Sequence, residues 1–115
     1  MAVVTGGVRR IGAAVARHLH GLGFDIALHY RASAADARAL ADELAALRPD
    51  SCEIFRADLT NPDETLAVAA AIRERYPAIR LLVNNASGFA PTPIDTCTPE
   101  QFDALLGSNL RGHIF

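Results

Sequence analysis

Short apolar runs alternate with segments of helical periodicity along the whole chain of 115 residues. Each run is too short for a helix of its own and ends in turn residues, as a buried strand does. Strands joined by helices of about 10–15 residues form right-handed crossover units, which build a parallel sheet. We therefore expect one doubly wound α/β unit of four strands. The expected strands cover residues 2–4, 24–30, 53–57 and 80–84, and the expected helices begin near residues 11, 33, 61 and 98.

The composition excludes several classes of protein. Half of the residues are apolar and the formal net charge is −2, so the chain can bury enough surface to fold. Its 11 basic residues do not outnumber its 13 acidic ones, which leaves no excess charge for nucleic-acid phosphates. No apolar stretch approaches the roughly 20 residues of a membrane span, and the first residues do not resemble a secretory signal. We expect a cytoplasmic protein with no nucleic-acid or membrane partner.

The chain contains no lysine, because all of its basic residues are arginines. A mechanism that needs a lysine side chain therefore cannot be completed by these residues alone. Cys52 and Cys97 are too far apart in sequence for a metal cluster, and we expect both to be free thiols that serve packing. No metal site is predicted.

Three helix starts carry the residue types of an N-cap followed by a partner in the first turn. The expected pairs are Ser33 with Asp36, Asn61 with Glu64, and Thr98 with Gln101. Apolar stripes at helical spacing indicate the faces of the first two helices. These stripes comprise Ile11, Ala14, Val15, His18, Leu19 and Leu22 in the first helix, and Leu40, Leu44 and Leu47 in the second.

The turn after the first strand is typical of a phosphate site. In Thr5-Gly6-Gly7-Val8-Arg9-Arg10-Ile11-Gly12, Gly6 permits a tight turn and Gly12 lets the helix pack close to the sheet. The free N–H groups and the dipole of the helix start favour an anion, and Arg9 and Arg10 add positive charge there. Glycine pairs also occur in ordinary strand-to-helix turns, but the position between a first strand and a helix favours nucleotide binding.

Polar residues follow the other expected strands at the edge where ligands bind in open α/β sheets. An NAD enzyme usually has an acidic residue after the second strand, and this chain has Arg31 and Ser33 instead. The guanidinium of Arg31 favours the 2′-phosphate of NADPH over NADH, the alternative being an exposed surface charge. Asp58 follows the third strand and is either an adenine contact or a turn residue. Asn84 and Asn85 follow the fourth strand, where they can border a cofactor or satisfy the loop backbone.

Asn109 lies at helical spacing from Phe102, Leu105 and Leu106, which predicts a polar amide on or beside the buried face of the last helix. An unpaired polar group there costs about 1–3 kcal/mol. Asn109 therefore either bonds the backbone or holds a water network in an active site, and spacing alone does not separate the two.

Taken together, these motifs resemble those of the short-chain dehydrogenases/reductases. They are Thr5-Gly6 with Gly12, Asp58 in Ala-Asp-Leu-Thr, Asn84-Asn85-Ala86, and Asn109 in Ser-Asn-Leu-Arg-Gly, and they span the chain in order. The family carries Gly where this chain has Arg10, and usually Gly where it has Ser87. Those departures, with residues 29–31, Phe89 and residues 91–93, resemble the pteridine reductase branch. We expect a Rossmann-like sheet with strand order 3-2-1-4, in which residues 1–115 form an NADP-binding domain that is incomplete on its C-terminal side.

The resemblance implies roles for individual residues. Arg10 would contact both a cofactor phosphate and the substrate, and Ser87 would bond the cofactor or a pterin. Phe89 would stack the pterin against the nicotinamide, unless it is ordinary loop packing. Asn109 matches the family's active-site Asn, which holds a water in the proton relay. The remaining cofactor contacts implied are Gly6, Ile11 and Gly12 at the turn, Tyr30, Arg31 and Ser33 at the adenosine and its 2′-phosphate, Asp58 and Leu59 at the adenine, and Asn85 and Ala86 beside the ribose.

The implied reaction is hydride transfer from NADPH to a carbonyl or imine carbon, with the proton supplied through a Tyr-x-x-x-Lys pair. That pair and the family's catalytic Ser are absent from these residues, so the chain resembles the amino-terminal half of such an enzyme and is predicted to be inactive alone. We expect a pterin or folate substrate, the alternative being a carbonyl or 3-ketoacyl compound. A chain that ended at Phe115 would instead be a non-catalytic NADP-binding or sensing module. Family members are usually homodimers or homotetramers, which implies an oligomer.

Overall fold

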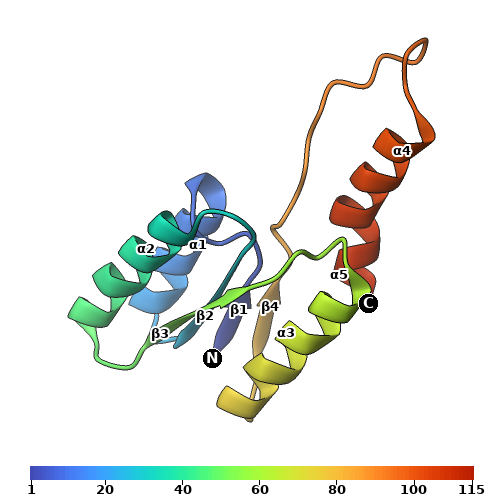
Figure 1. Ribbon diagram of the computed structural model, residues 1–115. Helices are drawn as coiled ribbons and strands as arrows, with labels where there is room; N and C mark the ends of the chain where they lie inside the picture. Colours follow the sequence, from blue (N-terminus) through green and yellow to red (C-terminus); the bar gives the residue numbers. More distant parts are fainter.

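The computed structural model describes residues 1–115 and contains one sheet flanked by helices (Figure 1). The elements are β1 (Ala2–Val4), α1 (Arg10–Gly21), β2 (Ile26–Tyr30), α2 (Ala34–Leu47), β3 (Cys52–Arg56), α3 (Pro62–Arg75), β4 (Leu81–Val83), α4 (Pro99–Leu106), the π-helix η1 (Gly107–Arg111) and α5 (Gly112–Ile114). The predicted alternation of strands and helices is confirmed. The C-terminal helix differs from the prediction because its continuation is a π-helix followed by one further short turn.

The four strands form a single sheet in the order β3-β2-β1-β4, and each neighbouring pair is parallel. In the central register, Val3 of β1 lies between Ala27 of β2 and Leu82 of β4. This arrangement confirms the predicted fold class and the strand order 3-2-1-4. Because all four strands run in the same direction, the loops that follow them gather along one edge of the sheet.

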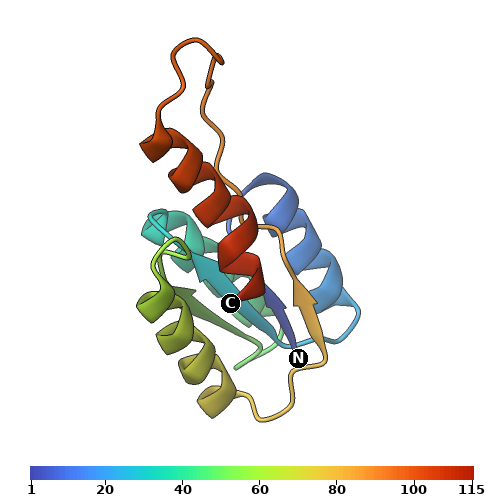
Figure 2. The same cartoon turned by 90° about the vertical axis from the view of Figure 1, so that its right-hand side faces the viewer.

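Alternate residues of the central strands face two separate apolar clusters, as the period of two along a strand requires. Helices α1 and α2 cover one face of the sheet, and α3 covers the other (Figures 1 and 2). The cluster beneath α1 and α2 contains Ala2, Val4, Ala13, Ala16, Ile26, Leu28, Leu40 and Leu44. The cluster beneath α3 contains Val3, Ala27, Ile72 and Tyr76. Strands β1 and β2 are therefore covered on both faces and hold the edge loops on a rigid base.

The buried face of α1 differs from the predicted one. Ile11 and Leu22 begin and end the predicted stripe, yet they are 73% and 64% exposed. The buried residues of α1 are Gly12, Ala13, Ala16 and His20. Small side chains let this helix lie close to the strands. Of the predicted stripe, Val15 and Leu19 are half-buried against the core, whereas the two ends of the stripe are exposed. In α2, Leu40 and Leu44 are buried as predicted, whereas Leu47 is exposed.

Two of the predicted N-caps are present. The side chain of Asn61 accepts hydrogen bonds from the N–H groups of Asp63 and Glu64, at 2.9 and 3.3 Å. Thr98 and Gln101 form a reciprocal capping box at the start of α4. Helices α3 and α4 therefore begin where the sequence predicts, with their first N–H groups partly satisfied by side chains.

The two other first-turn predictions are wrong. Ser33 makes no capping hydrogen bond at the start of α2, and Asp36 pairs with Arg9 of the glycine-rich turn instead. Glu64 does not reach back to its N-cap residue; its carboxylate accepts from the N–H of Asp58 at 2.7 Å. In both cases the acidic side chain pairs with a residue of a neighbouring loop, and local sequence spacing does not predict this contact.

The chain beyond β4 leaves the sheet as a long loop, and α4 projects away from the strands (Figure 2). No residue of α4 is buried, and Phe102 is 57% exposed. In β4, Leu82 is 54% exposed. None of the helices has the length and apolar character that a bilayer crossing requires.

Candidate functional site

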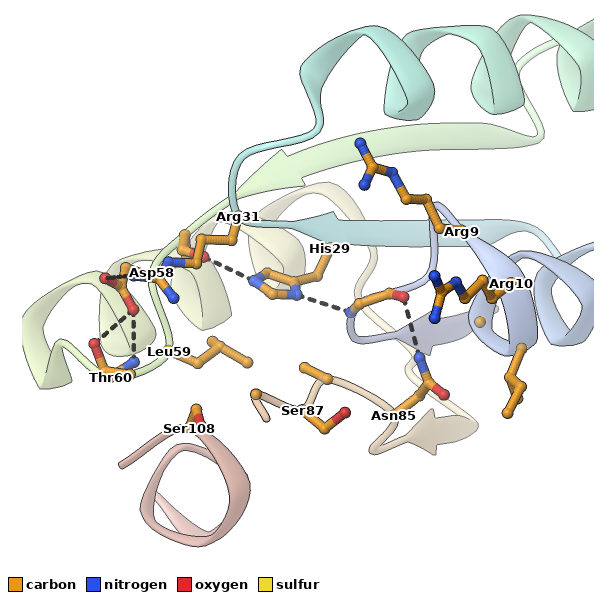
Figure 3. Close-up of a pocket in the computed structure, with 16 residues that line it drawn as sticks. Arg9, Arg10, His29, Arg31, Asp58, Leu59, Thr60, Asn85, Ser87 and Ser108 are labelled. Atoms are coloured by element: carbon orange, nitrogen blue, oxygen red, sulfur yellow. Dashed lines mark hydrogen bonds and ion pairs between the residues drawn. The ribbon is translucent and has the colours of Figure 1, made fainter. Parts of the chain in front are cut away.

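A cavity of about 390 Å³ opens at the edge where the strands end (Figure 3). Cavities of roughly 300–1,000 Å³ are typical of small-molecule and cofactor sites. The lining residues come from the loops after all four strands, from the start of α1 and from η1. They are Gly6, Arg9, Arg10, Ile11, Gly12, His29, Arg31, Ala57, Asp58, Leu59, Thr60, Asn85, Ala86, Ser87, Gly88 and Ser108. Most of the predicted binding residues are therefore brought together around one space.

The wall of the cavity formed by the turn after β1 and the start of α1 depends on two glycines. Gly6 has φ +60, a left-handed conformation that favours glycine, and an added Cβ would lie 2.9 Å from the Cα of Ala86. At Gly12, an added Cβ would lie 2.4 Å from the carbonyl oxygen of Gly6 and 2.6 Å from Nδ2 of Asn85. All three distances are shorter than van der Waals contact allows. The tight turn and the close packing of α1 that the sequence predicts at these positions are both present.

The hydroxyl of Thr5 joins this turn to the loop after β4. Its Oγ1 accepts hydrogen bonds from the N–H groups of Asn85 at 3.0 Å and Ala86 at 3.1 Å. The same hydroxyl donates to the carbonyl oxygen of Val83, and the side-chain amide of Asn85 donates to the carbonyl oxygen of Gly6 at 3.0 Å. These bonds fix two loops that are distant in sequence at the positions where they line the cavity.

The N-terminus of α1 opens onto the cavity without a side-chain cap or an acidic residue in its first turn. Helices α3 and α4, in contrast, begin with a capping side chain and an acidic first turn. The first N–H groups of a helix have no partner within it, so an uncapped N-terminus is suited to an anion. Arg10 lies at this end with φ +48, which strains a non-glycine residue. Arg9 extends toward α2, where it pairs with Asp36 (Figure 3).

Asp58 is held as a carboxylate at the opposite side of the cavity. Its Oδ1 accepts from the N–H of Thr60 at 2.9 Å and from the hydroxyl of Thr60 at 2.6 Å, and its Oδ2 lies 3.4 Å from the guanidinium of Arg31. The hydrogen bonds from Thr60, followed by the charge of Arg31, lower the pKa of Asp58. Asp58 is therefore an ionised acceptor, and Arg31 has an exposed side chain beside it that can turn to a bound anion.

Asn109 lies in η1 and is exposed, and α4 has no buried residue, so the buried face on or beside which Asn109 was predicted is not present. Of the two roles considered from the sequence, the structure contains the first, in which the side chain of Asn109 bonds the backbone. Its Oδ1 accepts from the N–H of Gly88 at 2.8 Å, and its Nδ2 donates to the carbonyl oxygen of Gly88 at 2.9 Å. This pair of bonds holds the loop after β4 against η1 and brings Ser108 to the cavity wall.

Four predicted site residues lie outside the cavity lining: Tyr30, Ser33, Phe89 and Asn109. The side chain of Phe89 is 90% exposed on the long loop, so neither packing nor a stacking contact involves it in this structure. Tyr30 and Ser33 flank Arg31 in sequence, at the end of β2 and just before α2. Neither residue lines the cavity, so their predicted contacts with the adenosine stay predictions.

Sequence reasoning missed three polar lining residues: His29, Thr60 and Ser108. His29 follows three apolar residues in β2, and a buried polar residue in a strand is a signal that could have identified it. Thr60 lies two residues after Asp58, a spacing typical of a turn in which a carboxylate accepts from the backbone. Ser108 gave no signal, because its position depends on the π-helix.

Comparison with models of known protein families identifies the family of this chain. The family model described as short chain dehydrogenase matches residues 1–115. The chain therefore belongs to the short-chain dehydrogenase family.

Individual relatives within the family are of similar identity. Pteridine reductase 1 of Leishmania tarentolae is 38% identical over 111 residues, covering 82% of this chain and 38% of the relative. A D-beta-hydroxybutyrate dehydrogenase of Rhizobium meliloti is 33% identical, covering 95% and 42%. A 3-oxoacyl-acyl-carrier-protein reductase of Staphylococcus aureus is 30% identical, covering 96% and 45%. The chain thus spans less than half the length of these curated relatives, whose names refer to different substrates.

A solved structure has the same fold at closely similar geometry. It is a short chain dehydrogenase from Burkholderia cenocepacia J2315 in complex with NADP, 35% identical in sequence, with a TM-score of 0.92. The likeness covers 98% of this chain and 46% of that chain. It extends the agreement from the sequence motifs to the arrangement of the strands and helices.

Proposed function

We propose that this chain is the cofactor-binding part of an NADPH-dependent short-chain reductase. The observation that carries the proposal is the uncapped N-terminus of α1, which opens with Arg10 onto a cavity at the carboxyl edge of the sheet. A diphosphate matches this donor set, because it offers acceptors to the free N–H groups and negative charge to the helix dipole and the arginine. The family membership and the NADP complex of the Burkholderia protein support the same ligand.

The preference for NADPH rests on the end of β2. Arg31 and Ser33 stand where an NAD enzyme usually has an acidic residue for the ribose 2′-hydroxyl. We assign the 2′-phosphate to Arg31, Ser33 and Tyr30, with the guanidinium of Arg31 turning from Asp58 to share its charge. Asp58 and Leu59 line the cavity beside Arg31 and are assigned to the adenine.

The reacting end of the cofactor is assigned to the loop after β4. Asn85 and Ala86 line the cavity there and would border the nicotinamide ribose, while Ser87 would bond either the cofactor or the substrate. The cofactor supplies the hydride. The chain contains no lysine, so a proton-donating Tyr-x-x-x-Lys pair would lie outside residues 1–115. In this proposal Asn109 holds a water of the proton relay, in addition to the loop contact that it makes with Gly88.

We further propose a pterin or folate as the substrate, held by Arg10, Ser87 and Phe89. The 38% identity with pteridine reductase 1 and the presence of Arg10 and Ser87 support this choice. A carbonyl or 3-ketoacyl substrate is the second candidate, supported by the 3-oxoacyl reductases at 30% identity. Following the intact protein's oxidation of NADPH with a pterin, a folate and a 3-ketoacyl thioester distinguishes the two. A cytoplasmic homodimer or homotetramer completes the proposal.

The cofactor assignment is tested by Arg31→Ala in the intact protein, with binding of NADP⁺ and NAD⁺ measured by titration calorimetry. Loss of a charge-assisted bond to the 2′-phosphate should weaken NADP⁺ by about 10- to 100-fold and leave NAD⁺ within about threefold. Arg38→Ala, an exposed arginine of α2 outside the cavity, is the matched control and should change neither. Equal losses for the two cofactors would remove Arg31 from the 2′-phosphate site.

A further inference from the structure

His29 lies at the centre of the cavity wall and is 4% exposed (Figure 3). It belongs to β2, between the turn after β1 and the loop after β3. Its Nδ1 lies 3.1 Å from the backbone nitrogen of Gly6, and its Nε2 lies 2.9 Å from the carbonyl oxygen of Ala57. One imidazole therefore links the ends of three neighbouring strands.

The two hydrogen bonds fix the state of the ring. The N–H of Gly6 can only donate, so Nδ1 of His29 accepts and carries no proton. The carbonyl of Ala57 can only accept, so Nε2 carries the proton. Only the neutral imidazole with its proton on Nε2 satisfies both partners, and an imidazolium would direct an N–H at the N–H of Gly6.

Gly6 is thus held from both sides in its left-handed conformation. The side chain of His29 accepts from its N–H, and the side chain of Asn85 donates to its carbonyl oxygen. The main chain of His29 adds a third bond, in which its carbonyl oxygen accepts from the N–H of Gly7 at 3.2 Å. The shape of the glycine turn therefore depends on β2 as well as on its own sequence.

We propose that His29 is a positioning residue for the cofactor: its neutral imidazole holds the glycine turn in the shape that receives the diphosphate. The proposal rests on the proposed function, since the turn has a binding role only if the cavity takes a dinucleotide. It follows that protonation of His29 releases Gly6 and weakens cofactor binding.

The surroundings of His29 keep it neutral near pH 7. Burial is the main cause that lowers its pKa below the usual 6.5, and the charge of His113 on α5 acts in the same direction. The bond to Ala57 and the carboxylate of Asp58 oppose this shift without reversing it. Arg10 and Arg31 are further charged groups that line the same cavity as His29.

Two substitutions separate the hydrogen bond from the shape of the side chain. His29→Phe keeps an aromatic ring but has no acceptor for Gly6, whereas His29→Asn keeps an acceptor near the position of Nδ1. In the intact protein at pH 8, His29→Phe should raise the Kd for NADP⁺ by about tenfold or more, the size expected when a buried donor loses its partner. His29→Asn should stay within about threefold of the unsubstituted protein. Thermal unfolding without cofactor is measured alongside, so that binding is compared only between folded proteins.

A pH series tests the protonation without relying on His29→Phe. Titrations of NADP⁺ from pH 8 to pH 5 should show a larger loss of affinity in the unsubstituted protein than in His29→Asn. Titration of the 2′-phosphate affects both proteins alike and cancels in the comparison. Identical pH profiles, or an unchanged Kd in His29→Phe, would overturn the role of His29. Failure of the unsubstituted protein to bind NADP⁺ at any pH would instead overturn the proposed function.

Discussion

Gly12 occupies a position where the backbone leaves no space for a side chain. An added Cβ would lie 2.4 Å from the carbonyl oxygen of Gly6, which is rigid main chain rather than a movable side chain. Gly21, at the other end of the same helix, has no such neighbour within 4 Å. Two glycines of one helix are therefore expected to respond in opposite ways to the same substitution.

We expect Gly12→Ala to lower the free energy of unfolding by about 2–3 kcal/mol, because α1 must move off the glycine turn. The same displacement should abolish NADP⁺ binding under the proposed function. Gly21→Ala should leave the free energy of unfolding unchanged or raise it by up to about 1 kcal/mol. Urea denaturation of the unsubstituted protein, Gly12→Ala and Gly21→Ala measures both changes in the free energy of unfolding. Equal stabilities would contradict the close packing at Gly12.

Two buried histidines make the stability depend on pH. Burial is the main cause that lowers the pKa of both His20 and His29 below 6.5. The unfolded chain, with ordinary pKa values near 6.5, then binds protons more readily than the folded one. Stability is full above pH 6.5, declines as the pH falls below that value, and levels off once the pH is below the folded pKa values.

The free energy of unfolding, measured by urea denaturation between pH 8 and pH 5, should therefore decrease toward acid. His20→Gln should reduce the slope, because an amide keeps a donor for Ser51 but does not titrate. His18→Gln is the control, since His18 is exposed on the same helix. An equal slope in His20→Gln and His18→Gln would exclude His20 as a source of the pH dependence.

At the scale of single elements, the helix starts differ in what holds them. Asn61 accepts two backbone hydrogen bonds at the start of α3, whereas Ser33 accepts none at the start of α2. Asn61→Ala should lower the free energy of unfolding by about 1 kcal/mol, the usual contribution of an N-cap. Ser33→Ala should change it by less than about 0.5 kcal/mol. Chemical denaturation of both variants checks the difference, and a larger loss in Ser33→Ala would contradict the observed caps.

The order and type of the elements could be predicted because they depend on local patterns. Alternating apolar runs and the Asn61 and Thr98 caps act within a few residues of themselves, and the glycines of the turn are visible as a local sequence motif even though their neighbours are distant. The failures depend on contacts between distant segments. Asp36 has the spacing of a capping-box residue, but in the structure it pairs with Arg9, which lies 27 residues earlier in the chain.

The candidate site was predictable to the same extent. Residues with a fixed place at a helix start or just after a strand, such as Arg10, Arg31 and Asp58, were identified and do line the cavity. His29 was not singled out, since its role is set by partners 23 and 28 residues away. Asn109 was expected on or beside a buried helix face, but α4 has no buried residue, so the periodicity indicated a face that no other element covers.

At the scale of the whole molecule, large apolar side chains remain exposed along the C-terminal helices. They recur at intervals of four residues from α4 to α5, which gathers them toward one side of the helical segment. They are Phe102, Leu106, Leu110 and Ile114, with exposures of 57%, 42%, 53% and 62%. Exposed apolar surface of this kind favours association.

The 115-residue polypeptide is therefore expected to self-associate, which sedimentation velocity over a range of concentrations measures. Leu106→Asn combined with Leu110→Asn should lower the average mass, because two members of the exposed series become polar. Leu66→Asn is the control, since Leu66 is also an exposed leucine, at 63%, but lies apart on α3. A monomer at every concentration, with a single cooperative unfolding transition, would contradict the expectation.

The bond between Thr5 and Asn85 has a consequence for the order of folding. It joins residues 80 positions apart, so the cavity can close only after the loop that follows β4 has reached the turn that follows β1. Closing so long a loop is slow, because its entropy is lost before the contacts that offset it are made. Under the proposed function, NADP⁺ would then bind after this last step and stabilise only the finished fold, by mass action.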